Sequence, residues 1–144
     1  RAVIGDFSPS GILLLAPLLL LSPPPAAAQA GLLSDPVVMT LVEEVLISDL
    51  MLRTCAEIRP SEEGLREVER IADDLARRAG HTPESAAEVL SGPEAIARAE
   101  AGAQRRLAMM GARPDETDAI CAVALRAVDA PGVIGALLER VDGR

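Results

Sequence analysis

Apolar residues recur every three to four positions along most of this chain, and that spacing limits the fold more than any other feature. It is the spacing of helices with one buried face, and no segment shows the two-residue alternation of a half-buried strand. The helix expected from Pro36 to Arg59 is apolar on nearly every side, so we expect it at the centre of the molecule. Further helices are expected over residues 61–80, 82–90, 93–110, 115–128 and 130–141. Short links between five to six short helices favour antiparallel neighbours, so the sequence predicts an all-α fold, a compact helical bundle.

The first thirty residues form a separate segment. An apolar run from Ile12 to Leu21 is followed by prolines and then by Ala28-Gln29-Ala30. The run is too short for a transmembrane helix, which needs about 20 apolar residues, and a short apolar core before an A-x-A site is typical of a cleaved export signal. We therefore expect residues 1–30 to be a cleavable signal and residues 31–144 to be a single helical domain. The domain would be periplasmic or secreted, with no integral membrane span after cleavage. An uncleaved anchor or an upstream extension is the alternative.

The composition limits which side chains can fill the core and which classes of partner the chain can bind. The chain has no Trp or Tyr, and its one Phe is Phe7, so aliphatic side chains must fill the core of the domain. The formal net charge is −8, and every basic side chain other than the single His is an arginine. Nucleic-acid binding needs a basic face that neutralises phosphates. We therefore expect no nucleic-acid partner.

Two cysteines, Cys55 and Cys121, lie beyond the expected signal. An even pair in a small exported protein indicates a disulfide, which would join the first helix of the bundle to the fifth. Reduced core thiols are a second interpretation. A catalytic thiol would need a His or cationic partner, and a zinc site would need three or four nitrogen or sulfur ligands. Because the chain offers two Cys and the single His81, these two chemical interpretations are the least favoured.

Few other polar residues suggest chemistry, and we expect no metal, no cofactor and no catalytic residue. Glu43 and Glu44 interrupt the most apolar helix, so we expect them to mark its solvent edge, with partial burial as the alternative. His81 follows Gly80 at a helix junction and is expected in a surface loop or a cap. No Glu-x-x-His pair is present, although a carboxylate metal site in a bundle is usually built with such pairs.

Met109 and Met110 stand just before Gly111 at the expected end of a helix. Methionine is a common filler of irregular gaps in a core, so core packing is the expected role. An exposed patch of Met and Leu that binds a partner is the alternative. These two residues join Glu43, Glu44 and His81 as the weak candidates for an interaction site.

The order of several residues resembles a family of small exported bacterial helical proteins of unknown function with two cysteines. The residues that carry the resemblance are Cys55 with Ile58, Gly80 with Thr82, Gly111 with Pro114-Asp115, Cys121, and Ile134-Gly135 with Leu137-Leu138. Members carry an aromatic residue where this chain has His81, and another within the stretch 107–110. The resemblance implies an all-helical fold with one disulfide and no known activity. Some members are named as subunits of an NADH dehydrogenase, but the chain lacks cluster-ligating cysteines and a dinucleotide-binding fingerprint.

Three hypotheses about function follow. The first is a non-enzymatic periplasmic protein that binds another envelope protein or complex as an accessory factor. The second is a periplasmic acid or stress chaperone, because many carboxylates make partial acid unfolding plausible. The third, and least favoured, is a ligand carrier or enzyme built on a cavity of the bundle, which would need convergent polar groups in a concave pocket.

Overall fold

A computed structural model describes residues 31–141 of the chain, and the signal predicted for residues 1–30 lies outside the described residues. Residues 31–34 are helical. The elements that follow are α2 (Pro36–Thr54), β1 (Ile58–Pro60), α3 (Glu62–Arg78), α4 (Pro83–Leu90), α5 (Pro93–Met110), α6 (Thr117–Ala127), α7 (Val133–Leu137) and β2 (Leu138–Arg140). The all-α fold class is confirmed. Within residues 31–141, no helix combines the length and the apolarity that crossing a membrane would require.

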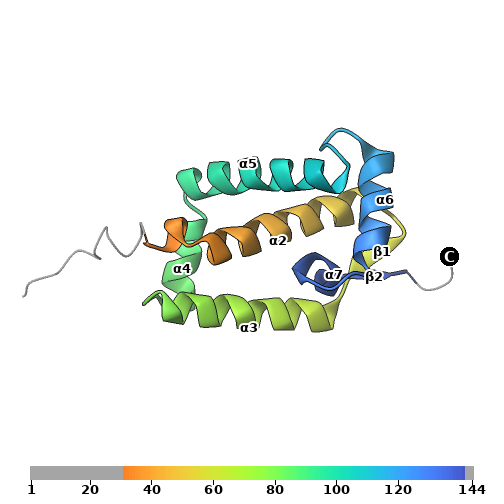
Figure 1. The fold of residues 1–144 in the computed structure, drawn as a ribbon. Helices are drawn as coiled ribbons and strands as arrows, with labels where there is room; N and C mark the ends of the chain where they lie inside the picture. The colour runs from red at the N-terminus through yellow and green to blue at the C-terminus, as the bar shows by residue number, and fades with distance from the viewer. Residues whose placement is uncertain (1–30, 142–144) are drawn as a thin grey trace, which may run out of the picture.

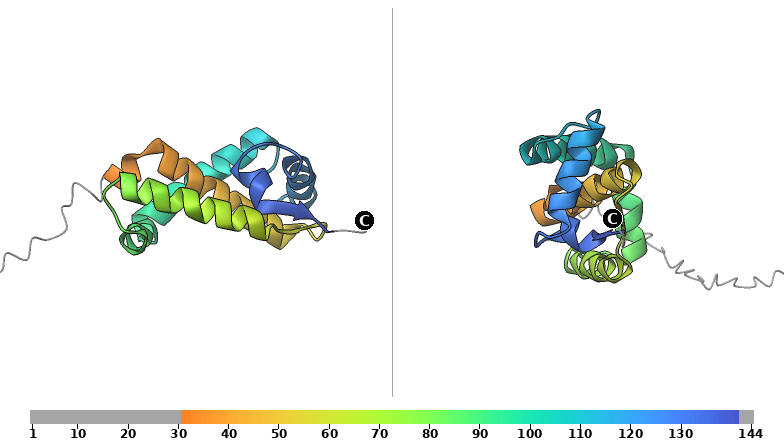
Figure 2. Two further views of the ribbon diagram at one scale, coloured as in Figure 1. Left: turned by 90° about the horizontal axis from the view of Figure 1, so that it is seen from below. Right: turned by 90° about the vertical axis from the view of Figure 1, so that its right-hand side faces the viewer.

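Helix α2 lies at the centre of the molecule, as the sequence predicts. Figure 1 shows it running between α5 on one side and α3 on the other, so that the three long helices form one layer. Helix α4 joins α3 to α5 at one end of this layer, and α6 crosses the opposite end. The end-on view in Figure 2 places α6 and α7 on one face of the layer and α4 on the other face. On one face of the layer, α6 and α7 therefore cover the C-terminal half of α2. On the other face, α4 lies mainly near the N-terminus of α2.

The start of α2 follows from its sequence. Asp35 is the N-cap, and its carboxylate accepts the backbone N–H groups of Val37 and Val38 at 2.8 and 3.3 Å. Pro36 occupies the first turn, where its missing N–H costs nothing. The helix ends earlier than expected, because Cys55 has extended backbone angles (φ −109°, ψ 113°). The predicted extension to Arg59 is therefore wrong.

A small antiparallel sheet replaces the ends of two predicted helices. Strand β1 pairs with β2, and Ile58, Arg59 and Pro60 stand opposite Arg140, Glu139 and Leu138. The expectation that the chain has no strand is wrong at this point, and the last helix ends at Leu137 instead of continuing to residue 141. Each strand has only three residues, which is too few for an alternating pattern to be recognised in the sequence.

The core is aliphatic, as the composition predicts. Its largest cluster joins α2, α5 and α6 with the C-terminal elements, and the best-buried large side chains in it are Ile47, Met51, Leu107 and Ile120. A second, smaller cluster near the N-terminus of α2 contains Leu32, Val38, Ala76 and Ala86. A third cluster, of Leu41, Val68 and Leu137, joins α2, α3 and α7. The described residues therefore form three apolar clusters along α2.

Helices α3 and α7 approach each other closely at Gly64. A Cβ at this position would overlap the backbone carbonyl of Ala136. The N-cap of α3 is also held there, since the N–H of Ser61 donates to the carbonyl oxygen of Leu137 at 3.0 Å. Residue 64 therefore has to be a glycine because there is no room for a side chain, and not because of its backbone conformation.

Candidate functional site

The two cysteines form one disulfide, so the first interpretation of this pair is confirmed. Cys55 is the C-cap of α2 and Cys121 lies on α6, with 5.0 Å between their Cα atoms. The bond therefore joins the first and fifth helices predicted from the sequence. Oxygen Oε2 of Glu57 lies 3.2 Å from Sγ of Cys55 and 3.1 Å from Sγ of Cys121. These three residues form a compact group, but disulfide sulfurs are not the thiolates that bind metals.

Glu43 and Glu44 lie at the interface of α2 with α5, not on the predicted solvent edge. Their side chains are 16% and 21% exposed. Arg106 of α5 contacts both carboxylates, at 3.3 Å from Glu43 and 3.6 Å from Glu44, and its guanidinium also donates to Oγ1 of Thr40 at 3.4 Å. Burial of a charge requires such partners. The alternative of partial burial is therefore the correct one for both glutamates.

Gly102 makes room for this cluster. It is buried on the side of α5 that faces α2, and a Cβ there would overlap the carboxylate of Glu43. Glu43 thus extends across the backbone of α5 and meets Arg106 one turn further along. The sequence gives little sign of this arrangement, because Glu43 and Arg106 are 63 positions apart.

Glu44 also borders a cavity on the face of the layer that carries α6 and α7. This cavity, which we call the front cavity, has a volume of about 300 Å³. Its walls come from α2, the end of α5, α6, the segment 130–132 and α7. Apolar atoms of Met110, Val123, Ala127 and Ile134 line it together with two charged side chains, Glu44 and Arg126. The front cavity is the place where a predicted interaction residue faces an open concave surface.

Arg126 is the cation of the front cavity. Its guanidinium donates to the carbonyl oxygen of Met110 at 3.4 Å, near the C-terminus of α5. Among residues 31–141 no carboxylate forms an ion pair with it. Neither Arg106 nor Arg126 could be predicted as a site residue, because arginines scattered along amphipathic helices are normally on the solvated face.

The opposite side of α2 carries two grooves. One lies between α2 and α3, has a volume of about 340 Å³, and is lined by Val45, Leu46 and Leu65 among others. The second lies between α2 and α5, has a volume of about 310 Å³, and is lined by Leu46 and Leu50 among others. We call Val45, Leu46, Leu50 and Leu65 with these grooves the open face. At 100° per residue, Leu46 and Leu50 point about 160° and about 120° away from Glu44, and Val45 about 100°, so the open face lies mainly on the side of α2 that faces away from the front cavity.

The remaining predicted residues lie elsewhere. His81 is at the α3–α4 junction, where its N–H donates to the carbonyl oxygen of Ala76 at 2.9 Å and its Nδ1 lies 3.3 Å from Oγ of Ser85. The predicted cap role is therefore confirmed by the backbone bond. Met110 is half-buried and lines the front cavity, whereas Met109 is 79% exposed. Core packing is the wrong interpretation for Met109, because its side chain lies on the outer side of the last turn of α5.

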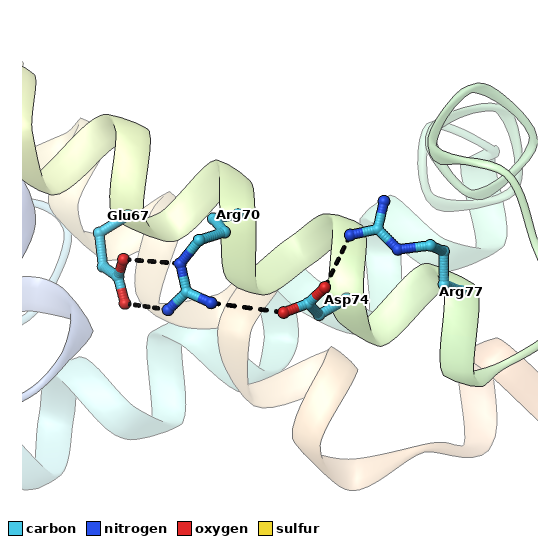
Figure 3. Close-up of polar contacts among 4 residues, drawn as sticks. All are labelled: Glu67, Arg70, Asp74 and Arg77. Atoms are coloured by element: carbon cyan, nitrogen blue, oxygen red, sulfur yellow. Dashed lines mark hydrogen bonds and ion pairs between the residues drawn. The ribbon is translucent and has the colours of Figure 1, made fainter.

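Helix α3 carries a row of ion pairs on its outer surface, shown in Figure 3. Arg70 contacts Glu67 at 2.6 Å and Asp74 at 3.4 Å, and Arg77 contacts Asp74 at 2.7 Å. The hydrogen bond from Arg70 holds the pKa of Glu67 below its ordinary value of 4.5. The hydrogen bond from Arg77 likewise lowers the pKa of Asp74 from 3.8. The four side chains are between 39% and 61% exposed, so solvent screens these interactions.

Comparison with known proteins identifies a family without a known activity. A protein-family model described as a family of unknown function (DUF5333) matches residues 30–139. No curated protein and no solved structure matches the chain. The match agrees with the resemblance to a family of unknown function that the sequence shows.

Proposed function

The chain belongs to DUF5333, a family of unknown function, and on that premise we propose that it is a non-enzymatic accessory protein that binds another protein in the periplasm or outside the cell. The observation that carries the proposal is the open face. Apolar side chains there border two adjoining grooves, and Val45 and Leu65 are 38% and 43% exposed. Grooved apolar surface of this kind is a typical docking site for an amphipathic helix.

Charge around the open face defines the partner further. Asp49 lines the groove beside α3, and Glu100 and Arg53 line the groove beside α5. Arg53 pairs with Asp49 at 2.9 Å, so these three groups carry a net charge of −1. The whole chain carries a formal charge of −8. Complementary charge raises the rate and the specificity of association. The partner is therefore an envelope protein that presents an apolar helix flanked by Arg or Lys.

The disulfide supports the proposed location. A bond between Cys55 and Cys121 persists in oxidising compartments and is rare in the reducing cytosol. The polar groups support a role without catalysis, since the half-buried glutamates of α2 are engaged by Arg106 and the two sulfurs are bonded to each other.

Two valines of α2 make a matched test. Val45 belongs to the open face, whereas Val37 is 58% exposed and lies on the same side of the helix as Glu44. We expect the purified oxidised chain to capture one envelope protein reproducibly. Val45→Asp should abolish this capture, and Val37→Asp should leave it intact. Equal capture by the two variants, or a captured protein without a basic-flanked apolar helix, would contradict the proposal.

Helix α3 favours a second candidate, an acid-activated chaperone. Its inner side covers an almost wholly apolar groove of about 190 Å³, lined by Leu32, Val38, Val68 and Leu75 among others. Its outer side carries the ion pairs of the two carboxylates whose pKa values are lowered. Protonation would weaken α3 and expose the groove. Binding of an apolar dye that rises between neutral pH and about pH 3 would support this candidate, and a flat signal would remove it.

A further inference from the structure

The front cavity has the chemistry of a small-molecule site, independently of the open face. Its volume of about 300 Å³ lies at the lower end of the usual range for ligand pockets. Apolar side chains form most of its lining, and its two charged groups have opposite sign. Such a lining suits a molecule with an apolar body and two charged ends.

The acidic wall carries charge that the protein does not neutralise. Glu43 and Glu44 contribute two negative charges, and Arg106, which contacts both, contributes one positive charge. The cluster therefore keeps a net charge of −1 in a half-buried place. Glu44 is the member of the cluster that lines the cavity, so a ligand ammonium group beside it would complete the pairing.

The basic wall is Arg126. Its described contact is a long hydrogen bond to the carbonyl oxygen of Met110, at 3.4 Å, and within residues 31–141 no carboxylate pairs with it. A guanidinium binds a carboxylate with two parallel hydrogen bonds. A ligand carboxylate is therefore the group that this wall would recognise.

The positions of the two charged groups limit the ligand. Glu44 lies on α2 and Arg126 on α6, so they approach the cavity from different helices. A free amino acid carries both of its charges on one carbon, whereas a dipeptide separates them along a chain that spans at most about 7 Å. A dipeptide can therefore present one charge to each helix.

We propose that the front cavity binds a short zwitterionic peptide with apolar side chains, with its free amino group at Glu44 and its free carboxylate at Arg126. Met110, Val123 and Ile134 contact the side chains of the peptide. This site lies on the side of α2 that faces away from the open face, so it can be tested without reference to protein binding.

The test measures binding of leucyl-leucine to the purified oxidised chain by calorimetry. N-acetyl-leucyl-leucine, leucyl-leucine amide and leucine serve as comparison probes. We expect the free dipeptide to bind at least tenfold more tightly than each of the other three. No binding at concentrations up to about 10 mM, or equal binding of the free and capped dipeptides, would overturn the proposal. Equal binding of leucine would overturn the assignment of a peptide.

Charge variants assign the two ends of the ligand. Glu44→Gln is expected to weaken binding of the free dipeptide at least tenfold and to leave binding of the N-acetyl dipeptide unchanged. Arg126→Gln is also expected to weaken binding of the free dipeptide at least tenfold, but to leave binding of the dipeptide amide unchanged. Arg105→Gln, an exposed neighbour on α5, is the control and should bind as the unaltered chain does. Ala130→Phe adds bulk at an exposed position of the cavity rim. Ala130→Phe should block binding of the free dipeptide, and it tests the site independently of the charge variants, should one of these fail to fold. Unchanged binding by Ala130→Phe would count against the site.

Discussion

The disulfide between Cys55 and Cys121 gives the sharpest quantitative prediction. The two cysteines are separated by 66 positions. In the chain-entropy model, a loop of this length removes about 15 cal/mol/K from the unfolded chain, which corresponds to about 4 kcal/mol at 25 °C. Small domains are stable by only about 5–15 kcal/mol. Loss of the bond should therefore remove a large part of the free energy of unfolding.

The assay is urea unfolding of the oxidised chain, of the reduced chain and of the double variant Cys55→Ala/Cys121→Ala. With a urea slope of about 1–1.5 kcal/mol/M, the midpoint should fall by about 3 M in both altered forms. The double variant is also the control for the reductant, because its own midpoint should not change on reduction. A loss below about 1 kcal/mol would refute the reasoning, and would mean that the unfolded chain is already compact in this region.

Three further predictions concern the contacts around α2 and α3. Gly64→Ala should lower the free energy of unfolding by about 1–2 kcal/mol, because a backbone carbonyl of α7 occupies the space; urea unfolding would contradict this if it showed the gain of about 1 kcal/mol that helix propensity alone predicts. Arg106→Gln should lower it by about 1–3 kcal/mol, because it leaves half-buried carboxylates without their charged partner, and unchanged thermal unfolding would argue against this pairing. The lowered pKa values of Glu67 and Asp74 mean that their stabilising effect is present above their ordinary pKa values of 4.5 and 3.8 and is lost as the pH falls through the lower values of the folded chain. The double variant to Gln and Asn should therefore show a flatter acid-unfolding curve, and an identical curve would exclude a contribution from this row of pairs.

The helices and the disulfide could be predicted because both depend on signals that are local or compositional. The apolar spacing around Ile47 and Met51 already indicates a central helix, and the composition requires the aliphatic core that is observed. The pairing of Cys55 with Cys121 follows from an even count in a small domain that is expected to be exported. In each of these cases no knowledge of distant contacts is needed.

The features that could not be predicted depend on residues far apart in the sequence. Glu43 is buried by an arginine and a glycine of α5, and neither residue type indicates such a contact by itself. The front cavity requires α2, α6 and α7 to be placed together. The end of α2 depends on β2, which pairs with β1 and holds residues 58–60 in an extended conformation. Long-range packing thus overrides the helical spacing that continues as far as Ile58.

The pairing of β1 with β2 also determines when the fold can close. Strand β1 receives its partner only after α3 to α7 have been synthesised. Until then Ile58, which is 5% exposed in the complete fold, lacks the strand opposite it. Contacts between such distant segments form late and slow the folding of the chain. In a ribosome-bound chain that ends before Leu138, residues 58–60 would therefore lack their partner strand. They would remain accessible to proteases and to transport machinery.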